Sequence, residues 1–68
     1  MKIINREIDR TKGLGYITIR FNNGNILEYT ILLDDYNNID GNNLKNAYHD
    51  ILKKYSLNVR TANGTKRY

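Results

Sequence analysis

The sequence predicts a small α+β domain in which one helix packs on a three-stranded antiparallel meander. Two observations lead to this prediction. The first 33 residues contain segments whose apolar and polar side chains alternate, as in half-buried strands. A later segment repeats apolar side chains at helical spacing. The expected elements are strands over about 2–8, 15–21 and 25–33, a helix over about 41–56, and then a short C-terminal strand or hairpin.

The second and third strands carry the clearest alternation. In the second strand, the apolar face carries Ile17, Ile19 and Phe21. Its other face carries Leu14, Tyr16, Thr18 and Arg20. In the third strand, the apolar face carries Leu27, Tyr29, Ile31 and Leu33. Because successive side chains point to opposite faces of a sheet, each strand is expected to bury one face and expose the other.

The loop between these strands sets their register. A two-residue turn at Asn23-Gly24 would pair Ile19 with Glu28, which sets an apolar face against a polar one. A three-residue loop over 22–24 pairs Ile19 with Leu27 instead, so that the apolar faces coincide. This loop needs Gly24 in the left-handed region, where glycine is favoured. We therefore predict the three-residue loop.

The first strand has a mixed pattern. Ile4 and Ile8 share a face with Arg6, whereas Ile3 lies on the other face. The strand is expected to pair with residues 15–21 through a turn over 11–13. Alternation alone does not indicate which of its faces is buried.

The helix is predicted by six apolar residues at i, i+3, i+4, i+7, i+8 and i+11, namely Leu44, Ala47, Tyr48, Ile51, Leu52 and Tyr55. Asp40 is a suitable N-cap, and Ile39 and Leu44 can form a hydrophobic staple around it. Lys53 and Lys54 lie in the last turns, where the helix dipole favours cations. The apolar side of this helix is expected to cover the apolar face of the strands.

The C-terminal part has two interpretations. Residues 57–61 are typical of a short strand, and Asn63-Gly64 is typical of a hairpin turn. Residues 58–68 therefore form either a short hairpin or a mobile basic tail of the single domain. A reduced OB-like barrel has the same order of elements and is the alternative fold. The strands after residue 57 are short for closing a barrel, which favours the open meander.

Positive charge is concentrated at the C-terminus. The chain has 11 Lys and Arg residues, 7 Asp and Glu residues, and a net charge of +4. All the acids lie at or before Asp50. The segment after Asp50 contains five cations, Lys53, Lys54, Arg60, Lys66 and Arg67. Such an asymmetry bears on partners and association rates rather than on fold.

The composition argues against catalysis and against a metal site. There is no cysteine, and His49 is the one histidine. Nucleophile, base and acid therefore cannot be assembled into a site. The acidic segment 34–41 lacks the ligand spacing of a calcium loop and is predicted to be a turn with a helix cap. We expect no enzymatic activity and no cofactor. The absence of cysteine, of a targeting signal and of a long apolar run favours a cytoplasmic location.

One stretch has a distinctive composition, Lys12-Gly13-Leu14-Gly15-Tyr16-Ile17-Thr18-Ile19. It resembles the basic–glycine–aromatic pattern of RNA-recognition strands and a similar run in cold-shock domains. The resemblance covers 8 residues, with Leu14 and Ile19 at positions where stacking aromatics are expected. It implies that Tyr16 stacks on a base. In the alternative interpretation, Gly13 and Gly15 serve a tight turn and Tyr16 is an ordinary strand aromatic.

The first functional hypothesis is a non-enzymatic accessory protein that binds nucleic acid. Phosphates would contact the basic C-terminal surface, and bases would stack on exposed tyrosines of the strand face or the C-terminus. The candidate binding residues are Lys12, Tyr16, Arg20, Lys53, Lys54, Arg60, Lys66, Arg67 and Tyr68.

A second hypothesis follows from the composition. Proline is absent, whereas asparagine, isoleucine, lysine and tyrosine, which use A/T-rich codons, are abundant. This pattern indicates a low-GC bacterium, or a phage or mobile element living in one. The alternative function is therefore a phage-encoded inhibitor of a host defence nuclease (anti-CRISPR type), acting by protein–protein binding through exposed tyrosines. Homodimerisation through a strand edge or the open sheet face is a third possibility.

Overall fold

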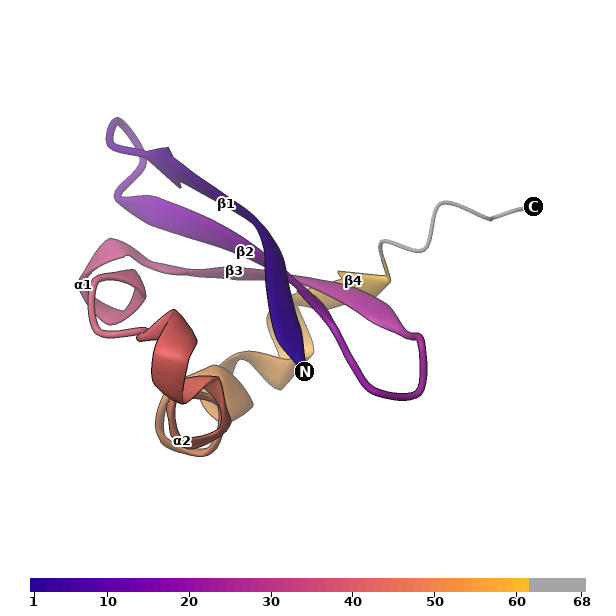
Figure 1. Cartoon of the computed structure of the whole chain (residues 1–68). Coiled ribbons are helices and arrows are strands. Elements are labelled where there is room, and N and C mark those ends of the chain that lie inside the picture. Colours follow the sequence, from indigo (N-terminus) through magenta and orange to yellow (C-terminus); the bar gives the residue numbers. More distant parts are fainter. Residues whose placement is uncertain (62–68) are drawn as a thin grey trace.

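The structure, a computed structural model, describes residues 1–61 apart from the side chains of Asn58 and Arg60. Its four strands form one antiparallel sheet in the order β1-β2-β3-β4 (Figure 1). The strands are β1 (Lys2–Asp9), β2 (Leu14–Arg20), β3 (Ile26–Leu32) and β4 (Val59–Thr61). Between β3 and β4 the chain forms the short helices α1 (Leu33–Tyr36) and α2 (Leu44–Asp50) and the 3₁₀ helices η1 (Gly41–Asn43) and η2 (Leu52–Asn58). The predicted α+β fold is confirmed.

The predicted register of the central hairpin is confirmed. Ile17 lies opposite Tyr29, and Ile19 lies opposite Leu27. The three-residue loop is closed by two backbone hydrogen bonds between Phe21 and the loop end, from the Phe21 N–H to the Asn25 carbonyl and from the Gly24 N–H to the Phe21 carbonyl (2.8 and 2.9 Å). Gly24 has φ of 91°, in the left-handed region that glycine tolerates.

A β-bulge resolves the mixed pattern of β1. Ile3 lies opposite Ile19, but the register shifts before Asn5, so that Arg6 lies opposite Ile17. The extra residue changes the phase of the alternation. Ile3 and Arg6 therefore both reach the face covered by the helices, which an uninterrupted strand would not allow. The predicted strand over 2–8 is confirmed in its extent.

The core lies between the sheet and the helical layer. Its buried residues come from β2, β3, the segment 36–39, α2 and η2, and they are Ile17, Ile19, Tyr29, Ile31, Tyr36, Ile39, Leu44, Ala47 and Leu52. The Asp40 carboxylate caps η1 by accepting from the Asn42 N–H at 2.9 Å. The predicted cap and the predicted covered face of the sheet are confirmed.

The prediction of one continuous helix over 41–56 is wrong. The α-helical segment ends at Asp50, and Ile51 has non-helical dihedrals of φ −123° and ψ −59°. The chain then continues as η2, in which residues three apart lie on one face. A kink at Tyr55, with φ −100° and ψ 16°, divides η2 into two short pieces. Leu52, at the start of η2, is fully buried. The six residues of the predicted apolar repeat still pack into or against the core, so the side-chain pattern is kept although the α-helix is interrupted.

The helix α1 was not predicted, because residues 25–33 were expected to be one strand. Strand β3 instead ends at Leu32, and the Leu33 N–H donates to the Gly13 carbonyl at 2.9 Å. Leu33 and Tyr36 then pack towards the core from a single helical turn. The Tyr36 ring lies against Gly15, where an added Cβ would be 2.3 Å from a ring carbon. Figure 1 shows α1 under the sheet near the β1–β2 turn.

The sheet is open, with β1 and β4 at its two edges in the part of the chain that the structure describes. The alternative OB-like barrel is therefore wrong, because within residues 1–61 the strand β4 pairs with β3 alone and does not meet β1. All the helical elements lie on one side, and the opposite face of the sheet carries no covering layer within residues 1–61 (Figure 1). We call this opposite face the outer face. In the same range, no helix has the length and apolarity needed to cross a membrane.

The buried Tyr29 predicts an alkaline loss of stability. Burial, together with the neighbouring Tyr48 and its hydrogen bond, raises the pKa of Tyr29 to about 12. In this pH range the Tyr29 hydroxyl keeps its proton in the folded state but loses it in the unfolded state. The contribution of Tyr29 to stability is therefore complete below the unfolded pKa, and it is lost as the pH rises towards the folded pKa. Between about pH 9 and pH 11 the free energy of unfolding should fall by about 1 kcal/mol through this group.

Urea unfolding of the protein and of Tyr29→Phe at both pH values measures this effect. The variant is expected to lose less stability over the same interval. Some alkaline sensitivity should remain, because the hydrogen bond to Asp35 raises the pKa of Tyr55 as well. Equal losses in the two proteins would contradict a role for Tyr29.

Candidate nucleic-acid interface

The structure does not bring the predicted binding residues together on one surface. Tyr16 and Arg20 lie on the outer face, on β2. Lys53 and Lys54 lie in η2, on the helical side of the sheet. Lys12 lies in the turn between β1 and β2, where its N–H donates to the Asp9 carboxylate at 3.1 Å. Arg60 stands opposite Glu28 in the register of β3 and β4. Lys66, Arg67, Tyr68 and the predicted turn at 63–64 lie outside the described residues.

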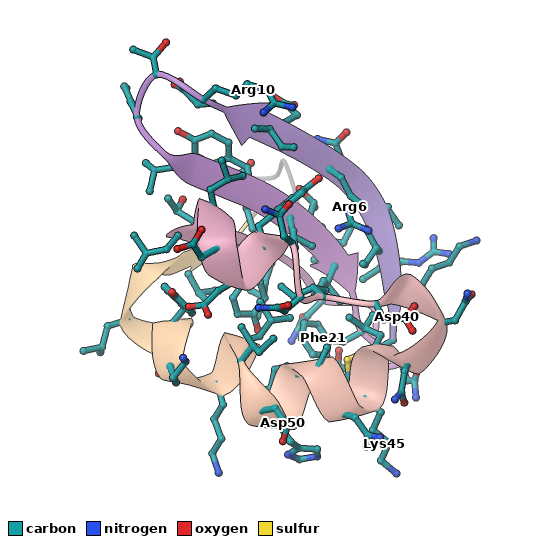
Figure 2. The ribbon with its side chains drawn as sticks, turned by 90° about the vertical axis from the view of Figure 1, so that its left-hand side faces the viewer. Arg6, Arg10, Phe21, Asp40, Lys45 and Asp50 are labelled. Carbon is teal, nitrogen blue, oxygen red and sulfur yellow. The ribbon has the colours of Figure 1, made fainter. Side chains whose placement is uncertain are left out.

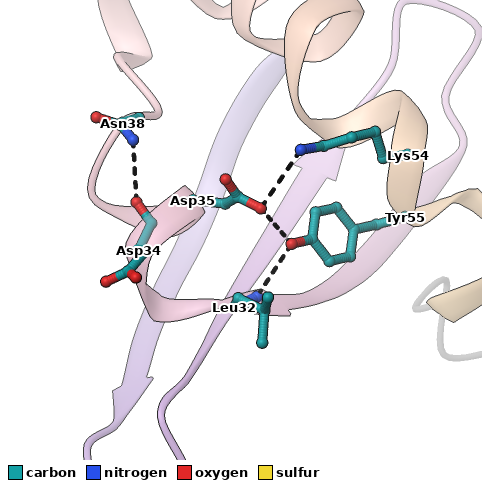
Figure 3. Close-up of polar contacts among 6 residues, drawn as sticks. All are labelled: Leu32, Asp34, Asp35, Asn38, Lys54 and Tyr55. Carbon is teal, nitrogen blue, oxygen red and sulfur yellow. Dashed lines mark hydrogen bonds and ion pairs between the residues drawn. The ribbon is translucent and has the colours of Figure 1, made fainter.

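Lys54 takes part in a contact between η2 and α1 (Figure 3). Its ammonium lies 3.6 Å from the Asp35 carboxylate. The same carboxylate accepts a hydrogen bond from the Tyr55 hydroxyl, which itself accepts from the Leu32 N–H at 3.5 Å. The Asp35 hydrogen bond holds the pKa of Tyr55 above its usual value. This cluster ties the end of β3 to η2, so Lys54 has a structural role that its charge alone did not indicate.

The outer face carries two cations directly opposite each other. Lys2 on β1 pairs in register with Arg20 on β2, and both side chains are exposed. Within residues 1–61, neither has an ion-pair partner. Like charges directly opposite each other in a sheet lower its stability. Two unneutralised cations at this position therefore make an attractive site for a negatively charged group.

The acids of β1 lie towards the other end of that strand. Glu7 accepts a hydrogen bond from the Asn5 amide at 3.0 Å, and Asp9 accepts from the backbone of the β1–β2 turn. Glu7 lies opposite Tyr16, and Asp9 lies opposite Leu14. The start of β1 thus carries Lys2 and Arg20 without an acid, whereas Glu7 and Asp9 lie towards a turn that also carries Arg10 and Lys12. The half-buried Tyr16 lies between these two ends.

The two glycines of the motif have structural roles. Gly13 has φ of 68°, which the turn between β1 and β2 requires. Gly15 leaves room for the Tyr36 ring. The Arg6 guanidinium lies 4.7 Å from the centre of the same ring. Arg6 Nε also donates to the Tyr36 hydroxyl at 3.2 Å. This outcome supports the structural interpretation of the glycines, while Tyr16 on the outer face stays a candidate for stacking.

A second candidate binding region, at the same end of the sheet, was missed by the sequence analysis. Lys45 and His49 lie four residues apart on the exposed side of α2, and both line a hollow of about 560 Å³. The sequence predicts only that Lys45 and His49 lie on the solvent-exposed face of a helix. No nearby residue in the sequence indicates that they approach the loop between β2 and β3. The lining also includes Asn22 of that loop, so only the packing of α2 on the sheet brings these residues together.

No group of three metal-ligating side chains occurs within the described part of the chain. His49 is exposed, and its ring lies edge-on to Tyr48 at a centroid distance of 5.6 Å. Comparison with models of protein families, with curated proteins and with solved structures finds no match.

Proposed function

We propose that this protein is a non-enzymatic nucleic-acid-binding protein that uses the cationic end of its outer face. The observation that carries the proposal is the pair Lys2 and Arg20, which oppose each other across β1 and β2 without an acidic partner within residues 1–61. A phosphate between them would replace their repulsion by attraction. Tyr16 lies on the same face of β2, four residues before Arg20, and offers a ring for stacking.

The basic C-terminal segment supports the same proposal. Its cations raise the net charge to +4, and charge of this sign attracts polyanions over a distance comparable to the Debye length. Arg60 lies in β4, opposite Glu28 of β3 in register. Lys53 lies on the helical side instead. Contacts of Lys66, Arg67 and Tyr68 with phosphates or bases stay predictions.

A binding titration tests this function with single-stranded DNA, duplex DNA and RNA at two salt concentrations. Affinity is expected to fall with salt, and Arg20→Ala should make the slope of log affinity against log salt shallower by about 0.7–0.9. Tyr16→Ala should weaken binding by about 1–3 kcal/mol without changing that slope. Lys53→Ala is the matched control, because this exposed lysine lies on the opposite side of the sheet.

Two results would reject the proposed interface. The first is binding that does not depend on salt, or no binding to any of the three nucleic acids at low salt. The second is an effect of Lys53→Ala equal to that of Arg20→Ala. That result would place the contact on the helical side or would indicate a diffuse attraction without a defined surface.

Protein binding is the second candidate, and exposed apolar groups on the outer face favour it. Leu14 lies opposite Leu32, and Leu32 is 58% exposed. Such a pair is a suitable anchor for a protein partner such as a host nuclease. A pull-down from nuclease-treated lysate of a low-GC bacterium, with Leu32→Ser as the control bait, separates the two candidates. A partner that survives nuclease treatment and is lost with Leu32→Ser favours the inhibitor function.

A further inference from the structure

The hollow beside α2 combines apolar walls with cationic and amide groups. It is lined from four segments of the chain, by Met1, Asn22, Gly41, Asn42, Leu44, Lys45, Tyr48 and His49. Its volume of about 560 Å³ falls within the range of small-molecule sites, which is about 300–1,000 Å³. Figure 2 shows Phe21 between the sheet and α2, with Lys45 near the start of that helix. The hollow is thus a composite feature of the tertiary structure.

The polar lining is made of donors rather than carboxylates. Lys45 supplies an ammonium and His49 an imidazole, and Asn42 supplies a side-chain amide. Asn22 is held in place because its side-chain oxygen accepts from the Met1 ammonium at 2.7 Å. This orientation leaves the NH₂ group of Asn22 as a donor.

No carboxylate belongs to the lining of the hollow. Asp40 precedes the hollow, but its carboxylate accepts from the Asn42 N–H in the helix cap. Asp50 follows His49 but does not line the hollow, and it forms no ion pair with Lys45 within residues 1–61. An anionic group that enters the hollow therefore meets the Lys45 ammonium and the His49 imidazole, and no carboxylate in the wall.

The apolar part of the wall suits a flat ring system. Tyr48 is half-buried, and its ring stands nearly perpendicular to that of Phe21 at a centroid distance of 6.0 Å. Leu44 lies one helical turn before Tyr48 and also lines the hollow, with 6% of its surface exposed. An aromatic base with an attached phosphate matches this division into apolar and cationic parts.

We infer that the hollow binds one nucleotide, with its phosphate at Lys45 and His49 and its base against Tyr48 and Leu44. The ligand is either a free nucleotide or the phosphorylated end of a nucleic-acid strand, because both present the same chemical groups. This inference rests on the proposed function for its ligand class. It adds a site on the helical side of the same end of the sheet that carries Lys2 and Arg20.

Backbone amide NMR spectra of the full chain test the site with AMP, adenosine and inorganic phosphate. AMP at millimolar concentration is expected to shift the signals of residues 41–49 and of Asn22. Adenosine, which lacks the phosphate, should bind at least about ten-fold more weakly. Lys45→Ala should weaken AMP binding by about the same factor, whereas Lys53→Ala should leave it unchanged. Both lysines are exposed, so neither variant is expected to affect folding.

The inference is overturned if AMP shifts only signals elsewhere in the protein, or if both lysine variants weaken AMP binding equally. An oligonucleotide with a 5′-phosphate, compared with the same strand ending in a hydroxyl, distinguishes the two sources of the ligand. Tighter binding of the phosphorylated strand that depends on Lys45 assigns the hollow to strand ends. Equal binding of the two strands, with AMP binding intact, assigns it to free nucleotides.

The failure of this site and the failure of the proposed function give different results. If AMP does not bind while oligonucleotides bind in a manner that depends on Arg20, the hollow is not a nucleotide site and the outer-face interface stands. If AMP binds while oligonucleotide binding is insensitive to Arg20→Ala, the hollow stands and the outer-face interface is rejected.

Discussion

Gly15→Ala is expected to destabilise the domain by about 1–3 kcal/mol or more, because it overpacks a site that has no spare volume. An added Cβ would lie 2.3 Å from a ring carbon of Tyr36 and 2.8 Å from its Cβ. Rotation of the ring alone cannot relieve a clash with the root of the side chain, so α1 has to move. This movement would also disturb Arg6, which lies over the same ring.

Chemical unfolding in urea measures this loss, and Gly41→Ala is the matched control. An added Cβ at Gly41 would meet its nearest atom, on Ile3, at 3.8 Å, which is an ordinary contact. Its effect is expected to stay within about 0.5 kcal/mol. If the two variants were equally stable, the close packing of Tyr36 on Gly15 would be wrong.

Leu52→Ala is expected to cost about 2–5 kcal/mol, because it removes a fully buried side chain and leaves a cavity. Leu52 is 0% exposed in the core between η2 and the sheet. A domain of this size has a total stability of about 3–10 kcal/mol. The variant should therefore be partly or wholly unfolded at room temperature, and circular dichroism with urea titration will measure the shift.

Leu57→Ala is a control of the same residue type in the same element. Leu57 is 97% exposed, so its truncation should change the free energy of unfolding by no more than about 0.5 kcal/mol. Leu52→Met, which keeps the volume, should cost less than about 1.5 kcal/mol and guards against a variant too unstable to measure. A larger loss from Leu57→Ala than from Leu52→Ala would refute the orientation of η2.

The local parts of the fold were predictable from the sequence. The register of β2 and β3 follows from alternation and from Gly24, because one loop length alone matches the two apolar faces. The Asp40 cap follows from the preference of a short carboxylate for free backbone N–H groups. These features depend on residues close together in the chain, so their patterns are visible without the tertiary structure.

The candidate site was less accessible to sequence analysis. Charge counting grouped Lys53 with Tyr16 as binding residues, although the predicted helix already lay on the face of the sheet opposite Tyr16, as the structure confirms. The pairing of Lys2 with Arg20 depends on the register across the β1 bulge, which alternation does not encode. The hollow depends on α2 packing next to the loop at Asn22. Each of these features joins residues that are distant in the sequence.

The sequence by itself determined the α+β class, the order of the main elements, the central hairpin and the basic character of the chain. Only the tertiary structure decided the bulge in β1, the end of the α-helix at Asp50 and the contact of Gly15 with Tyr36. The physical reason is that periodicity and capping are local preferences of small energy. Burial of Leu52 and Tyr36 in a shared core is worth more, and it selects backbone geometries that local preferences alone do not specify.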